Sequence, residues 1–175
     1  MDTELLKKVE QSVQNLENKS VRVYFLTQDT KGNAKASVRQ TYEMALTLKN
    51  NGFNPIIIHE TKEYTGVSEW LGEEFMELPH ECIDGEDLKI SPEDFIVVPE
   101  LYGHVLEQVA KLPCGKIVLC QAYDHMLETL QPGTNWSQYG FLKAITTNEK
   151  QTEYIKGIMK NVTFDIIEPL IPEDF

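Results

Sequence analysis

The sequence lacks the features that would place the protein in a membrane or in an oxidising compartment. No apolar run among its 175 residues approaches the roughly 20 that a membrane-spanning helix needs. No secretory signal peptide precedes the first predicted strand. The three cysteines, Cys82, Cys114 and Cys120, form no Cys-x-x-Cys pair, so neither a disulfide framework nor a zinc knuckle is indicated. We therefore expect a cytoplasmic protein.

Basic residues are scarce as well. The chain has 16 lysines and arginines against 28 aspartates and glutamates, for a net charge of −12. Between Thr65 and Glu100, eleven carboxylates stand against one lysine. Because such a surface repels phosphate backbones, nucleic acid is not expected as a partner. The acidic stretch is typical of a solvated face, and residues 84–87 lack the spacing of an EF-hand calcium loop.

The loop after the first predicted strand lacks the glycines of the common nucleotide-binding motifs. Only Gly32 is present where Gly-x-Gly-x-x-Gly requires three, and no P-loop Gly-Lys-Ser/Thr follows. The loop's candidate ligand-binding residues are Asp29, Lys31, Gly32 and Asn33. They predict either a polar ligand site at the start of the next helix or a plain surface loop. Glu60, where a ribose-binding carboxylate would lie, keeps a nucleotide-dependent oxidoreductase as an alternative.

What the sequence does contain is alternating strands and helices. Phe95–Val98 and Lys116–Cys120 are apolar at consecutive positions and flank a segment with helical spacing, which predicts central strands of a parallel sheet. Further strands are predicted over residues 21–26, 54–58, 75–78, 142–146 and 163–167. Further helices are predicted over 3–18, 66–72 and 126–130, and after N-caps at Ser37 and Asn148; residues 79–94 are predicted as loop. We expect one Rossmann-like three-layer α/β/α domain with a mainly parallel sheet over residues 1–175.

Residues 3–18 predict an amphipathic helix. Its apolar residues are Leu5, Leu6, Val9, Val13 and Leu16. Packing on the domain is the simplest interpretation of this stripe. Contact with a partner or a membrane surface stays open as the alternative, for which only Lys7 and Lys8 are available to hold anionic lipid.

Polar side chains follow the predicted strands where those strands end. They are His59, Glu60, Glu100, His104, Gln121, Asp124 and His125. Ligands of open parallel sheets bind beyond the carboxyl ends of the strands, so we expect a polar site there. The histidines do not predict a metal site, because His104 and His125 lack the close spacing of zinc ligands on one helix.

Four motifs stand in order along the chain. They are Asp-Phe-Ile-Val-Val-Pro-Glu-Leu-Tyr-Gly at 94–103, Lys-Ile-Val-Leu-Cys-Gln-Ala-Tyr at 116–123, Trp-Ser-Gln-Tyr-Gly at 136–140 and Ala-Ile-Thr-Thr-Asn-Glu-Lys-Gln at 144–151. Their order and spacing resemble the amino-terminal half of a GT-B glycosyltransferase of the group 1 type. Residues 167–175 are similar to the segment that leads into the second domain of that family.

The resemblance implies the acceptor-binding domain of an enzyme that moves a sugar from a nucleotide sugar to a saccharide or lipid-linked acceptor. The nucleotide-sugar donor would bind mainly to a carboxyl-terminal domain, and neither a metal nor another cofactor is implied. The 175 residues alone would then be inactive. A stand-alone Rossmann-like binding module without turnover is the alternative.

The polar rim and the resemblance together select the candidate site. Gln121 and His125 are the candidate catalytic residues. Many relatives place a histidine where this chain has Gln121, and a glutamine orients a hydroxyl but cannot act as a general base. The candidate acceptor-binding residues are Asp29, Lys31, Gly32, Asn33, Glu100, Tyr102 and Tyr123. Glu100 has a purely structural alternative as the cap of the helix that begins near Leu101.

Overall fold

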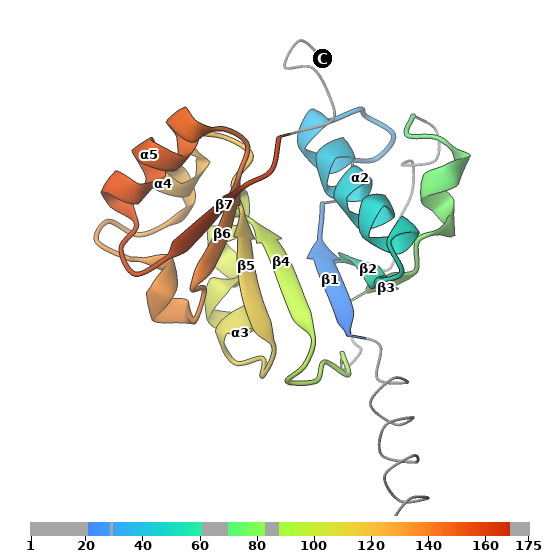
Figure 1. The fold of residues 1–175 in the computed structure, drawn as a ribbon, viewed down its shortest axis with the longest axis horizontal. Coiled ribbons are helices and arrows are strands. Elements are labelled where there is room, and N and C mark those ends of the chain that lie inside the picture. Colours follow the sequence, from blue (N-terminus) through green and yellow to red (C-terminus); the bar gives the residue numbers. More distant parts are fainter. Residues whose placement is uncertain (1–20, 29, 61–69, 83–87, 169–175) are drawn as a thin grey trace, which may run out of the picture.

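A computed structural model describes residues 21–28, 30–60, 70–82 and 88–168 of the chain (Figure 1). Within these residues, seven strands form one parallel sheet in the order β3-β2-β1-β4-β5-β6-β7. The strands are β1 (Arg22–Leu26), β2 (Asn54–His59), β3 (His80–Cys82), β4 (Phe95–Pro99), β5 (Gly115–Leu119), β6 (Lys143–Thr146) and β7 (Thr163–Ile166). The predicted parallel sheet is confirmed, with β4 in the middle and β5 beside it.

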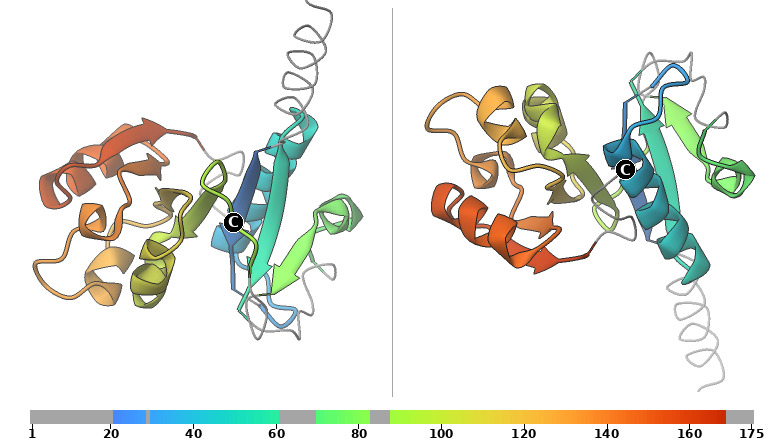
Figure 2. Two further views of the ribbon diagram at one scale, coloured as in Figure 1. Left: turned by 90° about the horizontal axis from the view of Figure 1, so that it is seen from below. Right: turned by 90° about the horizontal axis from the view of Figure 1, so that it is seen from above.

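Helices cover both faces of the sheet. The α-helices of the described chain are α2 (Ala36–Asn50), α3 (Leu106–Ala110), α4 (His125–Thr129) and α5 (Glu149–Ile158), and the 3-10 helices are η1 (Glu73–Glu77), η2 (Glu100–Val105) and η3 (Trp136–Tyr139). Figure 2 shows α2 beside the half of the sheet that holds β1, β2 and β3, and the later helices beside the other half. The predicted α/β/α layering is confirmed. None of the helices in these ranges is long and apolar enough to cross a membrane.

Alternation along the strands creates two separate cores. Tyr24 on β1 packs in a core with side chains of η2, α3, α4, η3 and α5. Its neighbour Phe25 points to the opposite face and packs in a core with α2 and η1. Successive residues of a strand point to opposite faces, so every central strand contributes to both cores. This double burial explains why these strands are apolar at consecutive positions.

The third strand differs from its prediction. Residues 75–78 do not form a strand. Phe75 belongs to η1, and the two buried side chains of this stretch, Phe75 and Leu78, are three residues apart. A spacing of three residues suits the 3-10 turn that they form. The strand is β3 instead, within the stretch predicted as loop. This strand lies at the edge of the sheet, and its three residues are too few to show a periodic pattern of apolar side chains.

Of the two predicted helix N-caps, one is wrong and one is confirmed. The prediction of Ser37 as an N-cap is wrong, since α2 begins at Ala36 and no side chain caps it. Asn148 is confirmed as the cap of α5, because its side chain accepts the backbone N–H of Gln151 at 2.9 Å. The helix predicted over residues 3–18, and most of the one over 66–72, lie outside the described residues.

An ion pair joins β1 to β4 at the amino end of the sheet. Asp94, which directly precedes β4, is 2 % exposed. Its Oδ1 accepts the backbone N–H of Arg22 at 3.0 Å, and its Oδ2 lies 2.8 Å from Nη2 of the same arginine. Oδ2 also accepts the backbone N–H of Ser91 at 2.8 Å. Burial raises the pKa of Asp94, but the Arg22 guanidinium and the N–H donors outweigh it and hold the pKa below its ordinary value.

Candidate functional site

The strand order places a topological switch point between β1 and β4. The chain moves from β1 to β2 and β3 on one side, then continues from β4 to β7 on the other. In such sheets a crevice opens beyond the carboxyl ends of the two switch-point strands. Here a small pocket of about 10 Å³ lies at that point, lined by residues that include Thr27, Gln28, Ser37, Tyr102 and Gln121. That volume has room for about one water molecule.

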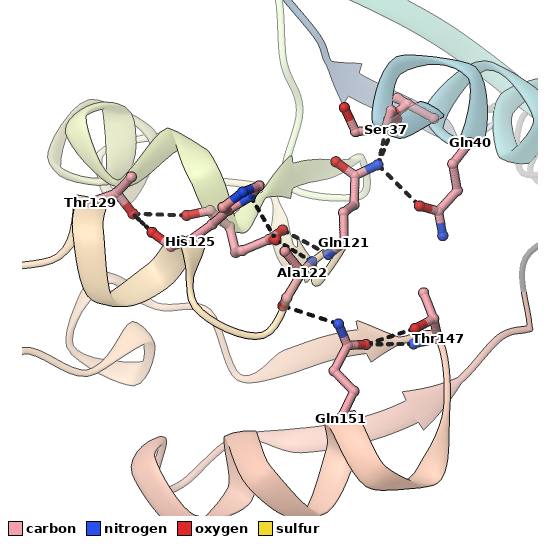
Figure 3. Close-up of polar contacts among 10 residues, drawn as sticks. Ser37, Gln40, Gln121, Ala122, His125, Thr129, Thr147 and Gln151 are labelled. Atoms are coloured by element: carbon pink, nitrogen blue, oxygen red, sulfur yellow. Dashed lines mark hydrogen bonds and ion pairs between the residues drawn. The ribbon is translucent and has the colours of Figure 1, made fainter. Parts of the chain in front are cut away.

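Glu100, the residue that follows β4, is hydrogen-bonded to the loop that follows β5. Its side chain is buried, and its two carboxylate oxygens accept the backbone N–H groups of Gln121 at 2.9 Å and Ala122 at 2.7 Å (Figure 3). Its carbonyl oxygen accepts the hydroxyl of Thr129 on α4 at 3.0 Å. The side chain does not cap η2, so the capping role considered for Glu100 is wrong. It joins two strand ends instead.

His125 lies beside this carboxylate, at the first position of α4. Its Nδ1 is 3.6 Å from Oε1 of Glu100 and is buried, whereas the side chain as a whole is 44 % exposed. One edge of the imidazole therefore faces the carboxylate while the ring remains accessible to solvent. Burial raises the pKa of Glu100, and the two N–H donors together with His125 act against this shift. A buried carboxylate behind an accessible imidazole is an arrangement that can orient the ring and stabilise its protonated form.

Gln121 connects the end of β5 to the start of α2. Its Nε2 donates to the carbonyl oxygen of Ser37 at 2.6 Å and lies 3.3 Å from both Oε1 of Gln40 and Oγ1 of Thr41 (Figure 3). The amide nitrogen is thus engaged within the protein. The amide oxygen accepts no hydrogen bond from the residues that the structure describes, and Gln121 is half-buried. This oxygen remains as an acceptor for a ligand.

The two candidate tyrosines occupy different environments. Tyr123 is 43 % exposed, its hydroxyl donates to Oδ1 of Asn148 at 3.3 Å, and its ring meets that of Tyr154 edge-on. Tyr102 is buried and lines the switch-point pocket. Burial raises the pKa of Tyr102, and its hydroxyl has no hydrogen-bond partner among the described residues. Tyr123 is therefore accessible to a ligand at the carboxyl edge of the sheet. Tyr102 is a buried residue in the wall of the switch-point pocket.

The loop between β1 and α2 holds the other predicted residues. Asp29 lies outside the described residues. Lys31 and Asn33 are exposed on a turn in which Gly32 has a φ of 81°, a left-handed conformation that glycine adopts without strain. The backbone and side-chain nitrogens of Asn33 both donate to the carbonyl of Thr30, at 3.0 and 3.2 Å. The ligand-binding role of this loop stays a prediction.

One buried residue of the edge was missed by the sequence analysis. Gln151 on α5 donates through Nε2 to the carbonyl of Ala122 at 3.0 Å, and its Oε1 accepts the backbone N–H of Thr147 at 2.8 Å. The loop after β5 is consequently held from two sides, by Glu100 and by Gln151 (Figure 3). The signal was present, because Asn148 and Gln151 have the spacing of a capping box. Gln40 and Thr41 had no comparable signal.

The comparisons with known proteins leave the site to be interpreted from its geometry. No family model matches the chain, and no curated protein or solved structure matches it. Across the described ranges, no three histidine, cysteine, aspartate or glutamate side chains come together as metal ligands. The structure thus gathers Glu100, Gln121 and His125 around one strand end, with Tyr123 beside them on the same loop.

Proposed function

We propose that this domain is the acceptor-binding half of a sugar transferase. The observation that carries the proposal is the pair of His125 and the buried Glu100 carboxylate at the carboxyl edge of the sheet. Gln121 and Tyr123 stand on the same loop and offer an amide oxygen and an exposed aromatic ring. Sugar hydroxyls are neutral donors and acceptors, which amides and aromatic surfaces recognise without a net charge.

His125 acts as the general base in this proposal. Its Nε2 takes the proton of the acceptor hydroxyl while the acceptor oxygen forms a bond to the anomeric carbon of the donor sugar. The bond from that carbon to the nucleoside diphosphate breaks, and the diphosphate leaves with the bonding electron pair. Glu100 faces Nδ1 and stabilises the imidazolium that forms, so it acts as a positioning residue. The free oxygen of Gln121 accepts a hydrogen bond from a hydroxyl of the acceptor.

Recognition of the donor is assigned to a second domain of a longer protein. A nucleoside diphosphate is anionic, and a chain with a net charge of −12 opposes its approach. Near the candidate site, Arg39 pairs with Glu43 at 2.9 Å and Lys35 donates to Gln28 at 3.3 Å. These contacts support a neutral acceptor here and a diphosphate clamp elsewhere. The chain alone should then bind nucleotide sugars weakly and transfer nothing.

A stand-alone binding module is the second candidate. It is favoured by the size of the switch-point pocket, about 10 Å³, and by the internal hydrogen bonds of Gln121. Such a module would bind a small polar ligand without turnover. An oxidoreductase receives less support, because Glu60, its candidate ribose ligand, lies 3.4 Å from Nε2 of His104.

A titration followed by NMR separates these functions. Saccharides, nucleotide sugars and nicotinamide nucleotides are each added to the labelled chain. The proposal expects saccharides to shift the signals of Gln121, Tyr123 and His125, and nucleotide sugars to bind weakly. Low-micromolar binding of a nicotinamide nucleotide would contradict the proposal and favour the oxidoreductase.

A substitution tests the proposed base directly. In the two-domain enzyme, His125→Gln should lower kcat by roughly 10²–10⁴-fold, the contribution of a general base, with little change in melting temperature or in acceptor binding. His104→Gln is the matched control, because His104 is an exposed histidine of the same edge that pairs with Glu60 instead. Transfer by His125→Gln at the rate of His104→Gln would overturn the assignment.

A further inference from the structure

Two exposed tyrosines lie side by side next to the candidate site. Tyr123, on the loop after β5, is 43 % exposed, and Tyr154 on α5 is 44 % exposed. Their ring centroids are 6.0 Å apart, and the ring planes meet at 64°. This edge-to-face geometry is a favourable aromatic contact, and both side chains keep a large accessible surface. The pair therefore presents aromatic surface to solvent, and Tyr123 is two residues from His125 along the chain.

Hydrogen bonds hold the loop half of this pair in place. The hydroxyl of Tyr123 donates to Oδ1 of Asn148, the N-cap of α5, at 3.3 Å. The preceding residue, Ala122, is held by Glu100 through its N–H and by Gln151 through its carbonyl (Figure 3). Because a ligand does not have to order a loop that is already held, Tyr123 is preorganised as a contact surface.

The helix holds the other half of the pair. α5 packs on the sheet through Ile155, which follows Tyr154 directly and is 0 % exposed. Tyr154 lies on the exposed side of α5, together with Lys150, Glu153 and Lys156. Polar residues are usual on that side of a helix, so packing of the domain does not require a tyrosine there. A tyrosine offers a large contact area at little cost in conformational entropy, which suits a ligand-binding surface.

The charges around the pair favour a neutral ligand. α5 carries two glutamates and two lysines, and therefore no net charge, in a chain whose net charge is −12. Asp124 adds a carboxylate next to Tyr123, which disfavours an anionic ligand. The C–H face of a sugar ring can stack on an aromatic ring, and its hydroxyls can exchange hydrogen bonds with tyrosine hydroxyls and with Asn148. A sugar thus fits this surface.

We propose that Tyr123 and Tyr154 form a second saccharide subsite, which binds the sugar ring next to the ring that accepts the transferred unit. The inference rests on the proposed function, because it takes the site of Gln121 and His125 as the first subsite. The ring in the first subsite carries the reacting hydroxyl, and the neighbouring ring stacks on the tyrosines. The acceptor is then an oligosaccharide of at least two rings, and not a single sugar.

An NMR titration of the labelled chain tests the subsite. Each monosaccharide is compared with the disaccharide built from it: glucose with maltose, mannose with mannobiose, and N-acetylglucosamine with chitobiose. Saccharides of both lengths should shift the signals of Gln121 and His125. The signals of Tyr154 should shift with the disaccharide alone, and the disaccharide should bind more tightly than the monosaccharide.

Substitution of Tyr154 measures the contribution of the second ring. Tyr154→Ala should raise the dissociation constant of the disaccharide by roughly 2–12-fold, the value of one aromatic contact, and leave that of the monosaccharide unchanged. Tyr154→Phe keeps the ring and should bind almost as the wild type does. Phe53→Ala is the matched control, because Phe53 is an aromatic residue with 54 % exposure that directly precedes β2 at the amino edge of the sheet. It should change neither constant.

The results separate failure of this inference from failure of the proposed function. Saccharides that shift Gln121 and His125 but gain no affinity from a second ring would overturn the second subsite and leave the proposed function standing. So would equal losses of monosaccharide and disaccharide binding in Tyr154→Ala, which would show a purely structural role. If no saccharide shifts Gln121, Tyr123 or His125, both are overturned. Tyr154 signals that move with protein concentration alone would identify a self-association surface instead of the subsite.

Discussion

The central strand β4 has a buried carboxylate at each end, and the two differ in what surrounds them. Asp94, before the strand, is 2 % exposed and Glu100, after it, is 3 % exposed. Asp94 is paired with the guanidinium of Arg22, and its pKa is lowered. Glu100 has two backbone N–H donors and a partly exposed histidine, and its pKa is raised. Equal solvent exposure thus accompanies opposite shifts of the pKa. Asp94 has the permanent charge of an arginine beside it, whereas Glu100 lies deeper in the protein and its desolvation outweighs its N–H donors.

This difference separates a structural carboxylate from one suited to chemistry. The charge of Asp94 is neutralised by a partner that does not lose its proton. The carboxylate of Glu100 instead faces the imidazole of His125, whose Nδ1 lies 3.6 Å from Oε1. In this molecule the carboxylate at the carboxyl edge is therefore distinguished by its depth and by its partners, and not by its solvent exposure.

Asp94→Ala should have the largest effect on stability. It removes the hydrogen bonds to Arg22 and Ser91 and the charged partner of the guanidinium, which keeps its bond to the Lys89 carbonyl, and should cost about 2–5 kcal/mol of unfolding free energy. Urea denaturation measures the loss. Asp165→Ala is the matched control: Asp165 pairs with Lys143 at 2.8 Å on exposed β7, and its loss should cost about 0–1 kcal/mol. Equal losses would show that the Arg22 pair is no stronger than a surface pair.

Glu100→Ala should have the next largest effect, a loss of about 2–4 kcal/mol of unfolding free energy. The N–H groups of Gln121 and Ala122 lose their acceptors, while relief from burying the carboxylate offsets part of the cost. Glu60→Ala, at the end of β2 and paired with His104, should cost less than about 1 kcal/mol. A Glu100→Ala loss no greater than that of Glu60→Ala would mean that the carboxylate does not hold the loop.

Gln151→Leu should have a smaller effect, because it acts on the same loop from the other side. The carbonyl of Ala122 and the N–H of Thr147 lose one hydrogen bond each, at about 1–3 kcal/mol in total. Lys150→Leu, one position earlier on α5 and exposed, serves as the control. If Glu100 and Gln151 hold the loop jointly, the double variant Glu100→Ala, Gln151→Leu should lose less than the sum of the two single losses. Strict additivity would indicate independent roles.

The pH dependence should be the smallest effect, and its sign should differ between the two carboxylates. The pKa of Glu100 is raised in the folded state, so above pH 4.5 the folded protein binds this proton more readily than the unfolded chain does. Protonation of Glu100 therefore stabilises the fold as the pH falls toward 4.5. Because the pKa of Asp94 is lowered, its contribution is present above pH 3.8 and is lost as pH falls below it.

Urea midpoints measured across pH for Glu100→Gln and Asp94→Asn, each compared with wild type, separate these contributions. As the pH falls, the wild type should gain stability relative to Glu100→Gln. It should lose stability relative to Asp94→Asn. The same sign in both comparisons would contradict the assigned directions.

The sequence predicted the strands with buried faces, and it predicted the edge at which the polar residues gather. Those predictions depend on local signals: the apolar run of β4, and polar residues such as Gln121 directly after a strand. Strand β3 was missed because three edge residues carry no period. The partners of Glu100 could not be predicted, because its acceptor role depends on how the ends of β4 and β5 lie side by side. Arg22 and Asp94 are 72 residues apart, and no local pattern connects them.

The pairing of β1 with β4 also has a consequence for how the protein folds. The other pairs of the sheet join strands that are consecutive in the chain, whereas β1 and β4 meet across a separation of 72 residues at the Arg22–Asp94 contact. Closing so long a loop costs chain entropy before any contact compensates for it, so we expect the two halves of the sheet to form first and to join late. The switch-point pocket has walls from both halves. Ligand binding should therefore appear only in the final folding phase, and a ligand would accelerate none of the earlier ones.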